Sequence, residues 1–305
     1  MGTAFGRISE IFVGERYEAT RKRLWEVIQA LFRRPMGAVG MVIILGFVGM
    51  AVLAPLLAGP PPTYFPRVNV GDPNLPPSSQ FPLGTDPFGK SNWALLVYGA
   101  QVSLIIGFVA SGVAMLLGTV IGVAAGYYGR FVDRTLSWIT NFFLVIPWLP
   151  FVIVMASILG RGFWTIVIAI AIVSWPTTAR VVRSKVLSLR TLGYIQRARA
   201  IGASEGHIMT RHVLPVLGPL IFANTILTVS NSIFTESFLA FFGLGDPATT
   251  SWGQMIENSW RNLDVLSGLY WAFLPPGICI TALVLAFTMV SHVLEEILNP
   301  RLRKR

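Results

Sequence analysis

Charged residues are scarce in this chain of 305 residues. Lys, Arg, Asp and Glu together make up 12% of it, whereas hydrophobic residues make up 53%. Soluble domains carry roughly 25% charged residues, so we do not expect a water-soluble enzyme or binding domain. Acidic residues are the scarcest, 14 against 24 Lys and Arg, and the formal net charge is +10. An excess of basic residues can indicate nucleic-acid binding. The positions of the Lys and Arg residues along the chain decide whether it does here.

Cysteine and histidine are also rare. Cys279 is the only cysteine, so no disulfide within the chain is possible. His207, His212 and His292 are scattered, and neither a cluster with metal-ligand spacing nor a nucleophile paired with a base is visible. We therefore predict no catalytic residue, no metal site and no cofactor bound by this chain, and we do not expect it to be an enzyme.

Long apolar runs are abundant. A helix needs about 20 residues to cross a hydrocarbon core of ~30 Å, and only helices or closed barrels satisfy their backbone groups in lipid. Six runs are long enough and continuous enough for helices, so we predict an all-α integral membrane protein with six transmembrane helices. The predicted spans are 36–59, 102–128, 136–160, 163–182, 216–244 and 268–292.

The basic residues follow the order of these spans. If the N-terminus is cytoplasmic, all but four of the 24 Lys and Arg residues fall in cytoplasmic segments. Such an asymmetry is the positive-inside rule, and it accounts for the net charge without nucleic acid. We predict that both termini are cytoplasmic and that the external basic residues are Arg67, Lys90, Arg161 and Arg261.

The chain is expected to have five parts. Residues 1–35 are predicted to form a cytoplasmic, basic amphipathic segment. We interpret this segment as a membrane anchor, and contact with a partner is the alternative. The charged leader is longer than that of a signal peptide, so the first span is expected to stay uncleaved. The other parts are the first span at 36–59, an external Pro-rich loop without its own core at 60–101, a five-span core at 102–292 with a cytoplasmic loop at 183–215, and a cytoplasmic tail at 293–305.

Glycine and proline mark two features of the spans. Gly118, Gly122 and Gly126 follow the small-xxx-small spacing that lets a second helix approach closely. Prolines remove backbone hydrogen bonds and mark bends, which serve either movement or ordinary packing. The prolines within the predicted spans include Pro147, Pro150, Pro176, Pro275 and Pro276.

Residues 84–91 match the phosphate-loop pattern G-x-x-x-x-G-K-[ST] letter for letter. A phosphate loop follows a buried strand and opens a helix that receives the phosphates. Here the preceding residues contain two successive prolines and no apolar run, and the predicted topology places the segment outside the cell. We therefore predict that this match is fortuitous.

Several stretches resemble the second permease subunit of dipeptide/oligopeptide/nickel ABC importers. They occur in order along nearly the whole chain, at 32–40, 81–90, 96–104, 236–245, 251–255 and 298–302. The resemblance implies the fold of a type I ABC importer permease in the prokaryotic inner membrane. It also implies that the chain forms half of a peptide pathway with a second homologous permease, served by an external binding protein and by two ATPase subunits that use ATP and Mg. Oligosaccharides or nickel complexes are the alternative solutes. An ATP-independent secondary transporter is less expected, because no inverted repeat is visible.

A cytoplasmic segment between predicted spans four and five resembles the coupling motif of importer permeases, E-A-A, three residues, G, nine residues, I-x-L-P. Gln and Arg replace the first two letters here and His replaces the Ile. Physically, Gly202 can end a short helix in the left-handed conformation and Ser204 can cap a second one. The resemblance implies coupling helices that contact an ATPase through Gln196, Ala198, Gly202, Ala203, Ser204, His212, Leu214 and Pro215. An ordinary basic loop is the alternative.

One polar stripe interrupts the apolar fifth span. Asn224, Thr228, Asn231 and Thr235 share one helical face, and polar groups in lipid face the bundle interior or water. The stripe either lines the solute path or bonds a neighbouring helix. Glu236 adjoins it and is either part of the path or a structural carboxylate.

Overall fold

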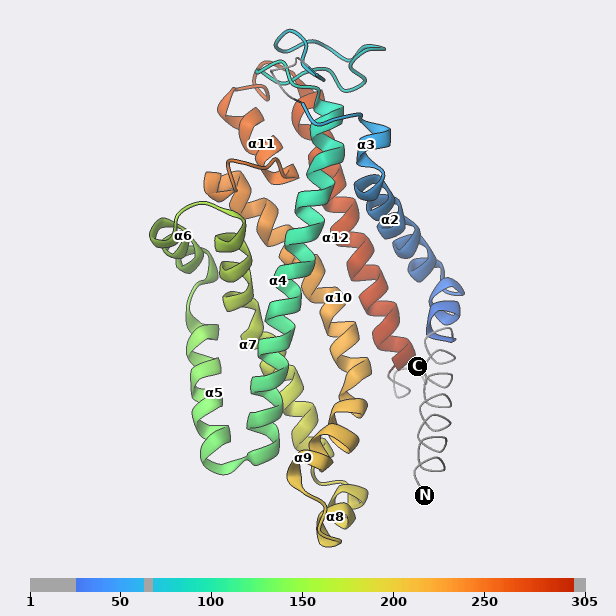
Figure 1. Ribbon diagram of the computed structural model, residues 1–305, viewed down its shortest axis with the longest axis vertical. Helices are drawn as coiled ribbons and strands as arrows, with labels where there is room; N and C mark the ends of the chain where they lie inside the picture. The colour runs from blue at the N-terminus through green and yellow to red at the C-terminus, as the bar shows by residue number, and fades with distance from the viewer. Residues whose placement is uncertain (1–25, 63–67, 299–305) are drawn as a thin grey trace, which may run out of the picture.

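The computed structural model describes residues 26–62 and 68–298. Three parts of the chain discussed above lie outside these residues, namely most of the amphipathic segment 1–35, Arg67 and the end of the tail. The described part is a bundle of helices with no β-strand, only isolated bridges in the loop before α4 (Figure 1). Its helices are α2 (Pro35–Val52), α3 (Ala54–Leu57), α4 (Asn92–Tyr128), α5 (Arg130–Val145), α6 (Trp148–Leu159), α7 (Phe163–Leu189), α8 (Gly193–Ala200), α9 (Glu205–Ile208), η1 (Met209–Val213), α10 (Leu214–Leu239), η2 (Ala240–Leu244), α11 (Trp252–Arg261) and α12 (Tyr270–Leu298).

Five helices are long and apolar enough to cross a membrane, and the bent pair α5 and α6 gives a sixth if it is one span. The helices run past the predicted spans. α4 begins at Asn92 rather than at residue 102, because Ser91 caps it by accepting a hydrogen bond from the Ala94 N–H. The fifth spanning helix runs from Glu205 to Leu244, with a kink at Gly243, whose φ is +75°. We call the end of the bundle that carries α8 and α9 the α8 end, and the opposite end the α11 end (Figure 1).

The predicted third span is not one straight helix. α5 and α6 meet at 90° across Ile146 and Pro147. Pro147 has no N–H to continue a helix and disfavours the helical conformation of the residue before it, and Ile146 is extended with ψ 127°. The span expected at 136–160 is therefore broken at its centre.

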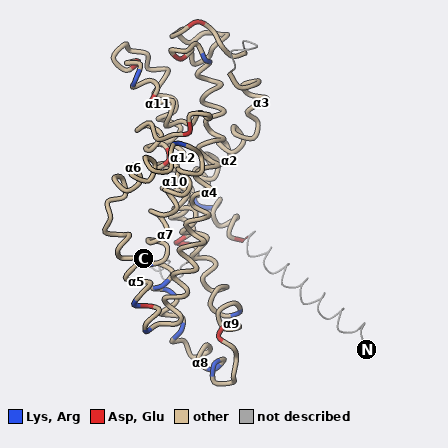
Figure 2. Tube along the Cα trace, turned by 60° about the vertical axis from the view of Figure 1, so that its left-hand side comes forward, with Lys and Arg blue, Asp and Glu red and all other residues tan. Residues whose placement is uncertain are grey.

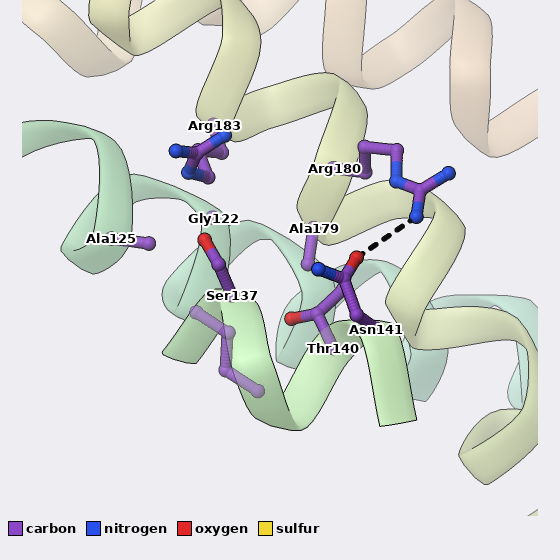
Figure 3. A pocket seen from close by; sticks show the side chains of 9 residues that line it. Gly122, Ala125, Ser137, Thr140, Asn141, Ala179, Arg180 and Arg183 are labelled. Atoms are coloured by element: carbon purple, nitrogen blue, oxygen red, sulfur yellow. Dashed lines mark hydrogen bonds between the residues drawn. The ribbon is translucent and has the colours of Figure 1, made fainter. Parts of the chain in front are cut away.

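Two polar contacts hold α5 against α7. The Arg183 guanidinium donates to both carboxylate oxygens of Asp133, at 2.5 and 2.9 Å. Arg180 donates to the side-chain oxygen of Asn141 at 3.0 Å, beside a small hollow of about 60 Å³ between α4, α5 and α7 (Figure 3). α5 is thereby tied to α7 through charged and amide groups as well as by packing.

The expected close approach at the α4 glycines is confirmed. A Cβ at Gly118 would lie 2.5 Å from the Thr178 Cβ, and one at Gly122 would lie 2.6 Å from the Ala179 carbonyl oxygen. Each glycine therefore lets the backbone of α7 come closer than any side chain would allow. On its other side α4 contacts α10, α10 contacts α12, and α12 contacts α2.

The short helix α11 is anchored to the bundle by Trp252. This side chain is fully buried, and its Nε1–H donates to the Leu96 carbonyl oxygen at 2.8 Å. The Phe47 ring of α2 packs edge-on against it, with centroids 5.3 Å apart. Ser251 and Gln254 form a capping box at the start of α11, so this helix has both a tertiary anchor and a local start signal.

The loop resembling a phosphate loop encloses a carboxylate of its own. The Asp86 side chain accepts hydrogen bonds from the Phe88 and Lys90 N–H groups, at 2.9 and 2.7 Å. A Cβ at Gly84 would lie 2.2 Å from the Leu75 carbonyl oxygen. Backbone donors that would bind phosphate in a true phosphate loop are thus occupied, and the space inside the turn is filled.

Lys and Arg gather at the α8 end of the bundle (Figure 2). They come from the α4–α5 turn, the last turns of α7, and α8 to η1. At the α11 end the described chain has three, namely Lys90, Arg161 and Arg261.

Candidate coupling knob and polar hollow

Residues 193–213 form a compact knob at the α8 end, which we call the knob (Figure 1). Gly202 has a φ of +84°, and two bonds close the helix end around it. The Gly202 N–H donates to the Arg199 carbonyl oxygen and the Ala203 N–H donates to that of Ala198, both at 3.1 Å. This is the Schellman arrangement, in which glycine avoids the strain of a Cβ at positive φ.

The second half of the knob begins at Ser204, whose hydroxyl accepts the His207 N–H at 3.3 Å. The conformations expected at Gly202 and Ser204 are therefore confirmed. η1 then carries the chain without a break into α10, whose second residue is Pro215.

The knob is seated on the bundle by apolar contacts. Ile195, Ile208 and Val213 are completely buried in a cluster that includes Val186 of α7 and Leu217 of α10. Burying a side chain of this size contributes about 1.5–3 kcal/mol. A force applied to the knob therefore acts directly on α7 and α10.

A polar contact spans the bend at Gly202. Arg199 and Glu205 form an ion pair with 3.1 Å between Nε and Oε1, and the Tyr127 hydroxyl at the end of α4 donates to Glu205. The hydrogen bond with Glu205 raises the pKa of Arg199 above its usual range, so this guanidinium stays charged. Sequence reasoning missed this trio, since Tyr127 is far from the other two in the chain.

The residues predicted for coupling all lie on the knob or at the start of α10. Gln196, Gly202 and Ser204 are exposed, as are Leu214 and Pro215. Ala198, Ala203 and His212 are half-buried. The His212 ring lies beside the rings of His207 and Tyr194, with centroids 5.9 and 6.1 Å away. An exposed face is therefore available for contact with another protein.

The four residues of the polar stripe line one hollow of about 280 Å³, which we call the polar hollow. The Asn224 side-chain nitrogen also lies 3.3 Å from the Thr178 Oγ1 of α7, and the Thr228 hydroxyl donates to the Asn224 carbonyl oxygen at 2.8 Å. The stripe thus both lines a cavity and bonds to neighbouring groups.

The facing wall of the polar hollow comes from α7 and α6. Ser174, Thr177 and Thr178 follow helical spacing on α7 and Trp148 of α6 adds an aromatic ring, while Phe234 adds a second ring from α10. None of the described residues that line the polar hollow is charged. The 174, 177, 178 spacing is visible in the sequence, but only packing shows that it faces α10.

Glu236 is not part of the polar hollow. Its side chain is 1% exposed and lies between α10 and α4, with the Ser103 and Ser237 hydroxyl oxygens 3.2 and 3.3 Å from Oε2. Glu236 thus contacts serines of α4 and α10 and does not line the polar hollow. Within the part of the chain that the structure describes, no three His, Cys, Asp or Glu residues lie close enough to hold a metal ion.

Comparison with known proteins gives consistent matches. Residues 118–304 match the family described as binding-protein-dependent transport system inner membrane component, and residues 23–77 match the N-terminal transmembrane domain of oligopeptide transport permease C. The dipeptide transport system permease protein DppC of Alkalihalophilus pseudofirmus is 36% identical over 280 residues, 91% of this chain and 90% of the relative. The oligopeptide transport system permease protein OppC of Bacillus subtilis is 33% identical over 286 residues, 92% of this chain and 91% of the relative.

Among solved structures, the MetNI methionine ABC transporter in inward-facing conformations matches with 22% identity and a TM-score of 0.47, covering 63% of this chain and 96% of that chain. This similarity adds nothing to the assignment, which rests on the sequence matches. The chain belongs to the family of binding-protein-dependent transport system inner membrane components.

Proposed function

We propose that this chain is a permease subunit of an ATP-driven importer and forms half of a pathway for peptides, beside a second homologous permease. The observation that carries the proposal is the convergence of the α10 stripe and the α7 hydroxyls on one uncharged hollow within a bundle of spanning helices. The names of the curated relatives, dipeptide and oligopeptide permeases, support peptides as the solute.

The chemistry of the polar hollow suits a peptide backbone. Amide and hydroxyl side chains can both donate and accept hydrogen bonds, as can the peptide group. A wall without fixed charge neither attracts nor repels a particular side chain, so it tolerates solutes of varied sequence. Selection among solutes is then left to an external binding protein.

The knob is proposed to transmit the work of two ATPase subunits. Its exposed face would contact an ATPase, and its buried residues lie against α7 and α10, which line the polar hollow. Movement of the knob would therefore reach the path through side chains in direct contact. Gln196 stands where the motif has Glu, so we assign no ionic contact to that position.

ATP and Mg are proposed to bind only to the ATPase subunits, and this chain to have no catalytic activity or cofactor of its own. The occupied turn around Asp86 supports this. The basic α8 end is proposed to face the cytoplasm, with both termini on that side, in the inner membrane of a prokaryote. The α11 end would then face the external binding protein.

The experiment is ATP-dependent uptake in vesicles that contain the complete importer. Asn231→Leu removes an amide from the polar hollow and should lower peptide uptake roughly 2- to 10-fold, the effect of losing one hydrogen bond, while the complex still assembles. Asn262→Leu is the matched control, because Asn262 is exposed beyond α11 and does not line the hollow.

Two outcomes would change the proposal. Uptake of oligosaccharides or nickel complexes in place of peptides would keep the importer class and replace the solute. Equal uptake by Asn231→Leu and Asn262→Leu would remove the polar hollow from the path.

A further inference from the structure

Three arginines from three elements border a second hollow, of about 470 Å³, beside the knob. We call it the arginine hollow and define it by Arg130 at the start of α5, Arg190 after α7, Arg199 of α8, and the neighbouring Tyr127 and Tyr128. Arg130 and Arg190 belong neither to the proposed coupling residues nor to the polar hollow, whereas Arg199 lies on the knob and Gln196 of the coupling residues also lines the arginine hollow. The arginine hollow therefore adjoins the proposed ATPase contact, and the transport proposal gives Arg130 and Arg190 no role.

Two of the three guanidinium groups are fixed in place by the fold. Arg190 Nη1 donates to the Gly126 carbonyl oxygen at 3.2 Å and lies 2.6 Å from the position that a Cβ on Gly129 would occupy. Gly129 also has a φ of +65°, a conformation that favours glycine. Arg199 is fixed by Glu205 and lies 3.4 Å from the Tyr127 hydroxyl.

The lining of the arginine hollow carries an excess of positive charge. Glu205 is its one carboxylate and is already paired with Arg199. The Arg130 guanidinium has no hydrogen bond or ion pair with another described residue. Guanidinium groups bind phosphate through paired N–H donors, and groups that are already fixed lose little entropy when a ligand binds.

Two exposed aromatic residues flank Gly129 and Arg130 in the chain. Tyr128, which lines the arginine hollow, is 54% exposed, and Phe131, the residue after Arg130, is 77% exposed. Tyrosine is typical of the membrane–water interface, and an exposed phenylalanine one position from Arg130 offers a surface to an acyl chain. A ligand that carries both a phosphate and an apolar tail matches this pairing better than a free phosphate does.

We propose that the arginine hollow binds the phosphate of an anionic lipid from the inner leaflet. Basic pockets between transmembrane helices on the cytoplasmic side suit lipid headgroups, and Arg130, Arg190 and Arg199 supply the donors here. The proposal uses the proposed function only for the orientation of the α8 end, and lipid binding can be measured without transport.

The test uses the complete importer purified into lipid nanodiscs, with bound lipid measured by native mass spectrometry. One preparation contains phosphatidylcholine alone and another also contains phosphatidylglycerol. The variant Arg130→Gln/Arg190→Gln should retain phosphatidylglycerol on the order of tenfold to thirtyfold less well, from the contribution of each basic residue near an anionic surface. Arg161→Gln/Arg261→Gln makes the same charge change at the α11 end and should retain it as the unaltered protein does. Arg130→Gln alone serves if the double variant does not assemble, because Arg130 is exposed.

A second arm separates the two sources of phosphate. Inorganic phosphate is titrated into the detergent-purified complex and binding is measured by calorimetry. Phosphate binding that depends on Arg130 and Arg190, without any preference for phosphatidylglycerol, would overturn the lipid assignment in favour of a soluble anion. Equal lipid retention in both double variants, without phosphate binding, would overturn the site. Loss of the ATPase subunits in Arg130→Gln without a lipid effect would assign the arginines to that interface instead.

Discussion

Arg199 and Glu205 face each other across the bend at Gly202, with the guanidinium Nε 3.1 Å from the carboxylate Oε1. The pair joins α8 to α9, the two short helices of the knob, and Tyr127 joins it to α4. Both side chains are about half exposed. Exposed pairs contribute only about 0.2–1 kcal/mol, so this contact sets the angle between the two helices more than the stability of the protein.

Reversing the pair tests that role. Arg199→Glu places two carboxylates side by side and should weaken binding of the ATPase subunits, whereas Arg199→Glu with Glu205→Arg should restore part of it. The expected coupling energy is about 0.2–1 kcal/mol, measured as a double-mutant cycle on ATPase-subunit affinity. Strictly additive effects of the two single changes would contradict a functional contact.

Gly202→Val should uncouple ATP turnover from transport. A side chain at positive φ costs roughly 1–2 kcal/mol, and the space around Gly202 is open, so the strain is in the backbone alone. Membrane insertion should be normal, while uptake and solute-stimulated ATPase activity fall. Gly206→Val is the control, since Gly206 lies in α9 with equally open surroundings and without a positive φ. Normal uptake by the assembled Gly202→Val complex would refute the coupling role.

Gly122→Val should destabilise the bundle. Its side chain would overlap the α7 backbone at the Ala179 carbonyl, and overpacking of this kind costs typically 1–3 kcal/mol. The measurement is the thermal unfolding midpoint of the purified chain in detergent. Gly112→Val places the same side chain elsewhere on α4, where nothing lies within 4 Å of the new Cβ, and should change the midpoint little. Equal midpoints for the two variants would contradict the close approach of α4 and α7.

Asp264 should make stability depend on pH. Burial raises the pKa of this carboxyl above its ordinary value of 3.8, although a hydrogen bond with Ser259 opposes the shift. The folded protein therefore binds the proton more tightly than the unfolded chain does, so this group's contribution to stability falls as pH rises from 3.8 through the raised pKa. Asp264→Asn should be more stable than the unaltered protein at neutral pH, and the difference should shrink toward pH 3.8. Thermal unfolding across this range, with Asp246→Asn as control, checks the sign.

The orientation of the two ends can be read by labelling. Ile201 and Leu266 are 85% and 82% exposed at the α8 and α11 ends. In a Cys279→Ser background, Leu266→Cys should react with an impermeant maleimide in intact cells, and Ile201→Cys should react only after permeabilisation. The reverse pattern would invert the proposed topology.

The features predicted correctly from sequence are those fixed by local chemistry. The length of the apolar runs identified the spanning helices, because a run of about 20 apolar residues is typical of a helix that crosses a membrane. Gly202 and Ser204 were predictable because one terminates a helix and the other caps one within a few residues. The spacing of Gly118, Gly122 and Gly126 indicated a close contact, although not that α7 was the partner.

The features that were missed depend on contacts between distant segments. In the sequence, Pro147 indicated a bend. The 90° turn between α5 and α6 also reflects the attachment of α5 to α7 through Asp133 and Asn141. α11 was not predicted, since its anchor, Trp252, is buried against α2 and α4. For Glu236 the sequence left a path role and a structural role open, because its contact with Ser103 of α4 cannot be read from its neighbours in the chain.

The helix from Glu205 to Leu244 has a mechanical consequence. Its forty residues extend over about 60 Å at ~1.5 Å per residue. A wider π-helical turn, η1, lies near one end, and η2 at the other end contains a kink at Gly243. Such turns are looser than the α-helix between them, and Gly243 adds a left-handed residue to the second. The polar stripe thus lies on an α-helical segment bounded by an irregular turn at each end, so a tilt of this segment about the stripe would move the knob and the α11 end of the helix in opposite directions.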